Sequence, residues 1–295
     1  TASLEHTCSR LPHSFFLYPT SPEEVFTVIN SIRNTSAGLD KFFAADMKLI
    51  AHLICDALCH IINLLFGTGF FPTSLKKAKI IPVFKKGDKR LISNYRPIAI
   101  ISFFSKVIEK LFAGRLRCYL DKFHILSNKQ FGFRPGYSTE LAMISLTEEI
   151  KYAIDSGSVV GGVFLDLSKA FDSISHDILF QKLESIGVSG VPLELIRNYP
   201  HDREQVVYVS GTFSNPKTID IDVSQGSILG PLLFLIYIND LPQCLAHSSC
   251  ILYADDTTIL TTDKDVDSML FKLNTDLINI VKWFDKNKFK IKRKC

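Results

Sequence analysis

Residues 159–166 read Val-Val-Gly-Gly-Val-Phe-Leu-Asp, and this stretch decides the fold. An apolar run rich in β-branched residues is typical of a buried strand. Its last residue, Asp166, places a carboxylate at the end of that strand. Because a charge beside apolar surroundings is costly when it is unpaired, Asp166 is expected to have a partner of opposite charge. The sequence therefore predicts a strand over 159–165 that delivers a functional carboxylate.

A second stretch, residues 250–261, reads Cys-Ile-Leu-Tyr-Ala-Asp-Asp-Thr-Thr-Ile-Leu-Thr and predicts a hairpin whose turn is Ala254-Asp255-Asp256. Two adjacent aspartates repel each other unless solvent or cations neutralise them. Taken alone, the pair is more typical of a surface turn, where Asp is common, than of a metal site. Because successive strand side chains point to opposite faces, one aspartate is expected deep in a shared site and the other at its edge.

The two stretches together indicate a metal site. If the strands are neighbours in one sheet, Asp166 and Asp255 can bind two Mg²⁺ ions, which keep water and phosphate oxygens as their other ligands. In such a site one ion lowers the pKa of an attacking 3′-hydroxyl and the other stabilises the pyrophosphate that leaves. The hypothesis is phosphoryl transfer.

The composition agrees with a folded protein. The 295 residues are 46% hydrophobic and 22% charged, with a net charge of +4. No repeat or flexible linker separates the chain into parts, which favours one compact unit of α+β class. Further strands are expected over 78–84, 206–213 and 217–223. Helices are expected over 21–33, 45–66, 102–120, 138–156, 172–186 and 226–238.

Charge, cysteines and hydropathy restrict the environment. Positive charge is concentrated in residues 76–90 and 286–294, which either meet phosphate or form solvated surface. Seven irregularly spaced cysteines are typical of reduced thiols inside a cell, in the nucleus, the cytoplasm or both. The most apolar run, 49–66, is interrupted by His52, Asp56, His60 and Asn63, so a buried helix is expected there and no membrane partner.

A series of motifs from residue 22 to the C-terminus resembles the reverse transcriptases of non-LTR retrotransposons, in particular jockey-like and CR1-like elements. The motifs follow one another in the order of that family. They are Phe84-Lys85-Lys86-Gly87-Asp88, Asn94-Tyr95-Arg96-Pro97-Ile98, Gln130-Phe131-Gly132-Phe133-Arg134, residues 164–172 (Phe-Leu-Asp-Leu-Ser-Lys-Ala-Phe-Asp), Gln225-Gly226-Ser227, Gly230-Pro231-Leu232-Leu233-Phe234 and Tyr253-Ala254-Asp255-Asp256.

The resemblance implies a right-hand polymerase core. Residues 1–21 are expected to be an N-terminal extension, 22–158 helix-rich fingers, and 159–295 a palm with an antiparallel sheet and helices on one face. Together they form one reverse transcriptase domain with a core at about 70–295, whose thumb is missing or truncated.

The resemblance also implies the site residues. Asp166, Asp255 and Asp256 are the expected catalytic, metal-binding triad for two Mg²⁺, with Mn²⁺ as a substitute. Phe171 is expected under the sugar of the incoming nucleotide, where its ring clashes with a 2′-hydroxyl; without the motif it reads as a core aromatic. The remaining nucleotide-binding candidates are Lys85, Arg96, Gln225 and Gly226, and the nucleic-acid-binding candidates are Lys86, Arg134 and Tyr253.

The implied function is RNA-directed DNA polymerase, a nucleotidyltransferase that extends a DNA 3′ end with dNTPs. Its partners are an RNA template and a DNA primer or nicked target DNA. One alternative is a decayed or co-opted fold that only binds nucleic acid, because Asp222-Val223-Ser224 stands where the relatives read Gly-Val-Pro. Another alternative is an RNA-dependent RNA polymerase, which uses the same metal chemistry.

Overall fold

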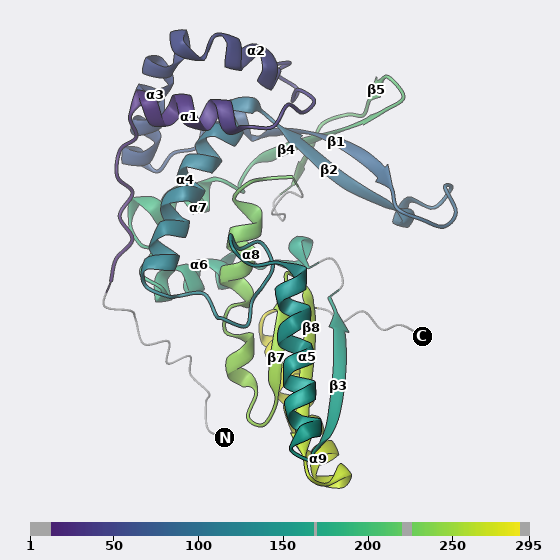
Figure 1. The fold of residues 1–295 in the computed structure, drawn as a ribbon. Coiled ribbons are helices and arrows are strands. Elements are labelled where there is room, and N and C mark those ends of the chain that lie inside the picture. The colour runs from purple at the N-terminus through teal and green to yellow at the C-terminus, as the bar shows by residue number, and fades with distance from the viewer. Residues whose placement is uncertain (1–12, 168–169, 220–225, 290–295) are drawn as a thin grey trace. The chain divides into compact units, whose positions relative to one another are not determined.

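The computed structural model describes residues 13–167, 170–219 and 226–289 (Figure 1). The chain divides into two compact units, each made of two separate stretches: unit 1 is Thr1–Tyr119 with Phe180–Gly230, and unit 2 is Leu120–Leu179 with Pro231–Cys295. The expectation of one compact unit differs from this division. No linker marks the boundaries because they fall inside helices, namely α4 (Phe103–Lys122), α6 (His176–Ser185) and α8 (Gly230–Ile238).

The sheet of unit 1 has the strand order β2-β1-β4-β5, with β6 pairing with β4 as well. Its strands are β1 (Lys77–Phe84), β2 (Tyr95–Ile101), β4 (Arg203–Val209), β5 (Thr212–Phe213) and β6 (Lys217–Ile219). The strands β1 and β2 form an antiparallel hairpin, whereas β4 lies parallel to β1. The strand β2 was not among the predicted strands; its residues 95–97 pair with β1, with Pro97 opposite Pro82. Proline reads as a strand breaker because it cannot donate a ladder hydrogen bond, and this concealed the strand.

Unit 1 contains helices at three of the predicted stretches, 21–33, 45–66 and 102–120, and one helix that was not predicted, over 191–198. They are α1 (Pro22–Ser31), α2 (Ala44–Leu49), α3 (Ala51–Thr68), α7 (Val191–Asn198) and most of α4. The Ser21 side chain caps α1 by accepting from the Glu24 amide, and Gly69 ends α3 in a left-handed conformation. The single helix expected over 45–66 is broken at Ile50, which separates α2 from α3. Short 3₁₀ turns lie at Thr73–Lys76 and Ile92–Asn94.

The helix α3 is long and predominantly apolar. Among the described residues it is the one helix long and apolar enough to cross a membrane, on length and composition alone. It contacts α1 and α7, and it buries Cys55, Cys59 and Ile62.

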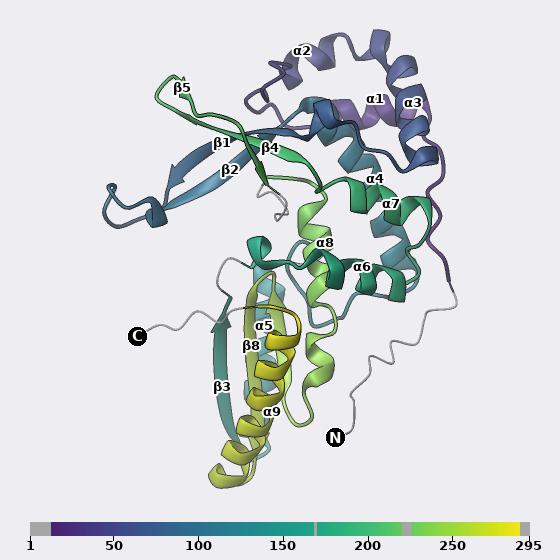
Figure 2. The same cartoon turned by 180° about the vertical axis from the view of Figure 1, so that it is seen from behind.

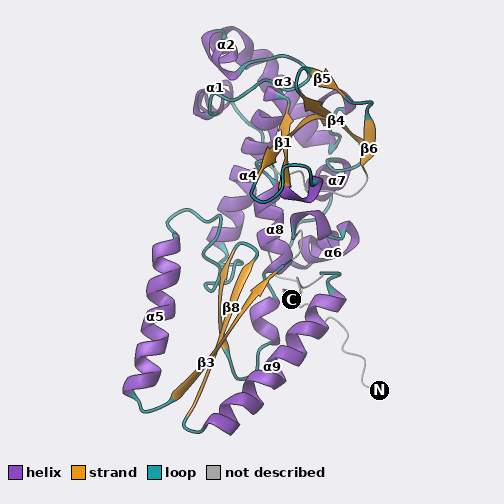
Figure 3. Cartoon of the chain, turned by 90° about the vertical axis from the view of Figure 1, so that its right-hand side faces the viewer, coloured by secondary structure: helices purple, strands orange, loops and turns teal. Residues whose placement is uncertain are grey.

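Unit 2 is built on the three-stranded antiparallel sheet β3-β8-β7. The strands are β3 (Val159–Asp166), β7 (Ser249–Tyr253) and β8 (Asp256–Asp263). Figure 3 shows this sheet between α5 (Thr139–Asp155) and α9 (Val266–Lys286), and in Figure 2 the helix α9 lies in front of the sheet. Helices therefore flank both sides of the sheet, whereas one covered face was expected. Gly161 permits this close packing, because a Cβ there would overlap the sulfur of Met269 in α9.

The hydrophobic pattern predicted the elements of unit 2 closely. The strand expected over 159–165 is β3, and the hairpin expected over 250–261 is β7 with β8. The helix expected over 172–186 begins later, with a 3₁₀ turn at Phe171–Ser173 before α6, and a further 3₁₀ turn follows α8 at Leu241–Cys244. Mixed helix and sheet content agrees with the expected class; the fingers, palm and thumb boundaries remain predictions.

Candidate active site

Two of the three predicted aspartates lie opposite each other at one end of the unit 2 sheet. β3 and β8 are antiparallel neighbours, and their register places Asp166 opposite Asp256. The next strand, β7, places Tyr253 opposite Asp256 on its other side. Residues directly opposite each other in an antiparallel pair have Cα atoms roughly 4.5–5.5 Å apart and side chains on the same face. The sheet thus brings Asp166 and Asp256 together from positions 90 residues apart in the sequence (256 − 166).

Asp255 differs from Asp256 in its surroundings. It lies in the turn between β7 and β8 and is half-buried, as is Asp166, whereas Asp256 is exposed. Of the two adjacent aspartates, Asp255 is therefore the more buried. The register thus pairs Asp166 with Asp256 rather than with Asp255, and Asp255 occupies the adjoining turn.

The chemistry of these groups suits a hard divalent cation. Carboxylate oxygens are the ligands that Mg²⁺ prefers, and like charges directly opposite on one sheet face are destabilising without a counter-charge. Within the part of the chain that the structure describes, no group of three or more His, Cys, Asp or Glu side chains is already gathered as a metal site. The metal-binding role of the triad therefore stays a prediction that rests on donor chemistry and strand register.

The turn that carries Asp255 has a strained backbone. Ala254 has a φ of 55°, in the left-handed region that costs a residue with a Cβ about 1–2 kcal/mol. Its amide donates to Gln130 Oε1 at 3.0 Å, and its carbonyl accepts from Gln130 Nε2 at 3.4 Å. The Gly132 amide donates to the same Oε1 at 2.7 Å. Gln130 lies in one of the motifs, but no role for it was predicted, because its neighbours Lys129 and Phe131 give no local signal of a contact with Ala254.

Phe171 lies in an aromatic stack within unit 2. Its ring centroid is 4.6 Å from that of Phe234 in α8 and 5.9 Å from that of Phe133. Phe133 has a φ of 56°, in the left-handed region of the backbone. Phe171 is half-buried and held by two other rings, and this position fits both a core aromatic and a wall of a nucleotide site.

Arg134 and Tyr253 were expected to contact nucleic acid. The Arg134 guanidinium donates to the Ser127 carbonyl at 2.7 Å and to the Gln130 carbonyl at 3.3 Å, and it lies 4.2 Å from the Tyr137 ring centroid. These contacts brace the loop at 127–137. Tyr253, 37% exposed on edge strand β7, has a surface available to a ligand. The nucleic-acid contacts of Arg134 and Tyr253 stay predictions.

The expected cationic residues of unit 1 lie on one hairpin. Lys85 and Lys86 follow β1 and Arg96 is on β2, and all three are exposed. The Lys85 amide donates to the Asn94 carbonyl at 2.8 Å, which closes the hairpin end. The structure thus places these cations on one hairpin of unit 1, while the aspartates belong to unit 2.

Gly226 is the remaining candidate in unit 1; Gln225, Asp222 and Ser224 lie outside the described residues. Gly226 has a φ of 127°, and a Cβ there would overlap the carbonyl oxygen of Ala99 in β2. Glycine is therefore required by backbone conformation and by close approach.

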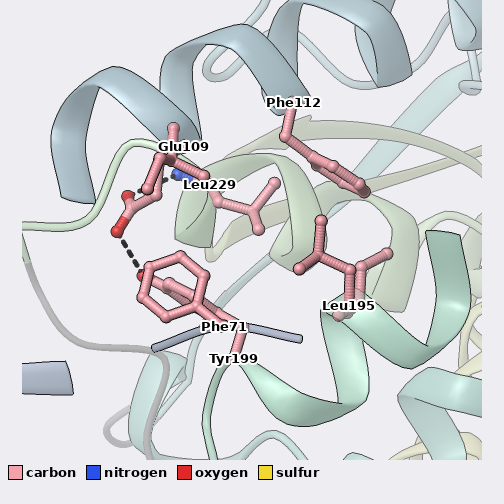
Figure 4. A pocket seen from close by; sticks show the side chains of 8 residues that line it. Phe71, Glu109, Phe112, Leu195, Tyr199 and Leu229 are labelled. Atoms are coloured by element: carbon pink, nitrogen blue, oxygen red, sulfur yellow. Dashed lines mark hydrogen bonds between the residues drawn. The ribbon is translucent and has the colours of Figure 1, made fainter. Parts of the chain in front are cut away.

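The segment after Gly226 is anchored by a buried carboxylate that sequence reasoning missed. Glu109 in α4 is 1% exposed, and its Oε2 accepts from the amides of Ile228 at 2.6 Å and Leu229 at 3.3 Å. Its Oε1 accepts from the Tyr199 hydroxyl at 2.6 Å (Figure 4). Burial raises the pKa of Glu109, although these hydrogen bonds oppose the shift. Burial also raises the pKa of Tyr199, with the Glu109 charge acting in the same direction.

The cavity beside Glu109 is not a ligand site. It is lined mainly by apolar side chains, including Phe71, Phe112 and Leu195, and its volume is about 10 Å³ (Figure 4). A space of that size holds at most about one water molecule. The hydrogen bonds of Glu109 therefore have a structural role, which is to hold the segment after Gly226 against α4.

Gly226→Ala is expected to lower the free energy of unfolding by about 1–3 kcal/mol, because alanine is strained at that φ and meets the Ala99 carbonyl. Gly114→Ala is the matched control. Gly114 is an exposed helical residue with no atom near its missing Cβ, so alanine should stabilise α4 by about 0.5–1 kcal/mol. Urea denaturation followed by circular dichroism measures both; equal midpoints would contradict the close approach at Gly226.

Comparison with known proteins identifies the family. A family model described as "Reverse transcriptase (RNA-dependent DNA polymerase)" matches residues 83–295. The chain is 31% identical over 282 residues to a "Probable RNA-directed DNA polymerase from transposon BS" of Drosophila melanogaster, covering 92% of this chain and 31% of that protein.

Two further relatives have similar names. One is the "RNA-directed DNA polymerase from mobile element jockey" of Drosophila funebris, at 29% identity with 82% of this chain and 27% of the relative covered. The other is the "Probable RNA-directed DNA polymerase from transposon X-element" of Drosophila melanogaster, at 30% identity with the same two coverages, 82% and 27%.

The chain thus spans 27% to 31% of the length of these relatives. The family model covers all the motifs, from Phe84 onward. These findings confirm the resemblance drawn from the motifs. The chain belongs to the reverse transcriptase family, alongside the RNA-directed DNA polymerases of non-LTR retrotransposons.

Proposed function

We propose that this chain is the polymerase part of a non-LTR retrotransposon protein and extends a DNA 3′ end with dNTPs on an RNA template. The observation that carries the proposal is the register of β3 and β8, which sets Asp166 opposite Asp256 beside the Asp255 turn. Membership of the reverse transcriptase family supports the proposal that these acidic residues share one site. The primer is a DNA strand, free or at a nick in target DNA.

In this proposal Asp166, Asp255 and Asp256 hold two Mg²⁺ ions, or Mn²⁺ in their place. When bound, the ions supply positive charge to the 3′-hydroxyl and to the triphosphate. The protein's contribution is to fix the carboxylates: Asp166 by its strand, Asp256 by the β3 to β8 ladder, and Asp255 by the turn. Carboxylates held in one geometry spare the reaction the cost of ordering them.

The parts of the polymerase follow from this assignment. We assign the β3-β8-β7 sheet to the palm and the β1–β2 hairpin to the fingers. The exposed Lys85, Lys86 and Arg96 suit charge-assisted hydrogen bonds to a triphosphate or to the template backbone. Gly226 begins the segment that we assign to the surface beneath the template and the incoming nucleotide. The place of action is inside the cell, in the nucleus, the cytoplasm or both.

Primer extension tests the proposal. The chain is incubated with a DNA primer on an RNA template, Mg²⁺ and labelled dNTPs, beside a filter-binding assay with the same duplex. Extension with dNTPs is the expected result. Binding without extension would favour a fold that only grips nucleic acid, and extension with ribonucleotides as efficient as with dNTPs would favour an RNA polymerase.

Phe171→Ala is expected to reduce the preference for dNTPs over ribonucleotides on the order of 10- to 100-fold, because the ring that excludes a 2′-hydroxyl is removed. The measurement is the ratio of kcat/KM values for a dNTP and the matching ribonucleotide. Phe213→Ala, which truncates an exposed ring on β5, is the control and should leave the ratio unchanged. An unchanged ratio in Phe171→Ala would mean that the ring is only part of the core.

A further inference from the structure

The segment at 129–132 runs beside the strand that leads to the Asp255 turn. The Leu252 amide donates to the Lys129 carbonyl at 2.9 Å, and the Phe131 amide donates to the Leu252 carbonyl at 2.8 Å. Gln130 and Leu252 form an isolated parallel bridge outside the named strands. This segment therefore acts as a short additional strand at the free edge of β7.

The Gln130 side chain extends from this segment to the turn. It is 2% exposed, and it bonds both the amide and the carbonyl of Ala254. Its Oε1 also accepts from the Gly132 amide, so the side chain is itself held in place. A buried amide with all these contacts fixes the peptide that comes directly before Asp255.

Gly132 makes the same approach from the backbone. A Cβ at this position would overlap the Ala254 amide nitrogen. The loop backbone thus lies against the turn, and there is no space for Ala254 to move toward it. Two independent features, the Gln130 side chain and the missing side chain of Gly132, restrict one residue of the turn.

We propose that Gln130 is a positioning residue: it holds the left-handed Ala254 peptide so that the Asp255 carboxylate faces the site. This inference rests on the proposed function, since it gives Asp255 a metal-binding task. Glutamine suits the place because it offers an acceptor and a donor without a charge, whereas a carboxylate would add repulsion beside Asp255 and Asp256. Misplacement of a reacting group by about 1 Å can reduce a rate on the order of 100-fold.

The test compares Gln130→Met, which keeps the volume and removes the hydrogen bonds, with Gln243→Met, an exposed glutamine of the same unit. Gly132→Ala is a second variant that displaces the turn while Gln130 stays intact. Each is studied as the full chain at a temperature at which its circular dichroism shows it to be folded. The measurements are kcat and KM in primer extension, Mn²⁺ binding by electron paramagnetic resonance, and hydrogen exchange of the Ala254 amide.

Gln130→Met and Gly132→Ala are expected to lower kcat on the order of 10- to 100-fold with a KM for dNTP within about twofold of the original. They should also weaken Mn²⁺ binding and speed exchange at Ala254. Gln243→Met should change none of these. A purely structural role would speed exchange without altering Mn²⁺ affinity or kcat, and that outcome would overturn the inference.

The inference and the proposed function fail in different ways. If the original chain does not extend primers at all, the proposed function is in error, and Mn²⁺ affinity then decides the inference by itself. If the original chain is active and Gln130→Met matches it in kcat and in Mn²⁺ affinity, Gln130 is not a positioning residue although the polymerase assignment stands.

Discussion

Asp255→Asn is expected to reduce nucleotide incorporation by about 10³-fold or more while the fold remains intact. The substitution keeps the size of the side chain but replaces an anionic oxygen with an amide, which is a poor ligand for a divalent cation. A metal ion that stabilises developing charge contributes several kcal/mol to the transition state, and each 1.36 kcal/mol corresponds to a tenfold change in rate. Single-turnover primer extension at saturating Mg²⁺ measures the loss.

The control for this prediction is Asp155→Asn, which neutralises an exposed aspartate at the end of α5, away from the hairpin turn. It should extend primers at the original rate. Circular dichroism and thermal unfolding must agree among the three proteins, so that a loss of rate is assigned to the site. Incorporation by Asp255→Asn at the original rate would remove Asp255 from the catalytic residues.

Glu109→Ala is expected to lower the free energy of unfolding by about 3 kcal/mol or more. The change leaves the Tyr199 hydroxyl and the amides of Ile228 and Leu229 without their acceptor, and each buried donor left unpaired costs about 1–3 kcal/mol. Chemical denaturation measures the loss. Glu148→Ala, at an exposed position of α5, is the control and should be within about 0.5 kcal/mol of the original.

Glu109→Gln separates the hydrogen bonds from the charge. Its amide oxygen can accept from the two backbone amides while its NH₂ donates to Tyr199, so the fold should be kept. Burial raises the folded-state pKa of Glu109 above the ordinary value of 4.5. The stabilising contribution of the neutral carboxyl is therefore complete below pH 4.5 and is lost as the pH rises through the folded-state pKa.

Denaturation curves for the original chain and Glu109→Gln, taken from about pH 4 to about pH 8, test this linkage. The free energy of unfolding of the original chain should fall relative to that of the variant as the pH rises. A constant difference across the range would show that Glu109 has the same pKa folded and unfolded.

The sequence predicted the local elements that position the site. The run from Val159 to Asp166 and the alternation around Ala254 depend on neighbouring residues alone, so β3 and the β7–β8 hairpin were found with nearly correct bounds. Asp166 and the Asp255 pair were also identified, because carboxylates beside apolar strands stand out. What no local pattern contains is register: only the folded sheet shows that Asp256, not Asp255, lies opposite Asp166.

The parts that were missed depend on distant partners. Glu109 lies on the α4 face that also presents Phe112, and such an acidic residue on an apolar face gives no indication of which donors it meets. Gln130 is similar, since its partner Ala254 lies 124 residues further along the chain. The two-unit division was hidden because its boundaries fall within helices rather than in a linker.

The parallel pairing of β1 with β4 has a consequence for synthesis on the ribosome. Lys77 is made long before its partner Glu204, and the chain passes between the units at 119/120 and 179/180 in the meantime. Residues 1–119 complete neither unit, because unit 1 also needs residues 180–230. The β1–β2 hairpin must therefore emerge with one edge unpaired, and such edges are prone to aggregation. Nascent chains that stop before β4 should need chaperones more than those that extend past residue 263, where β8 ends.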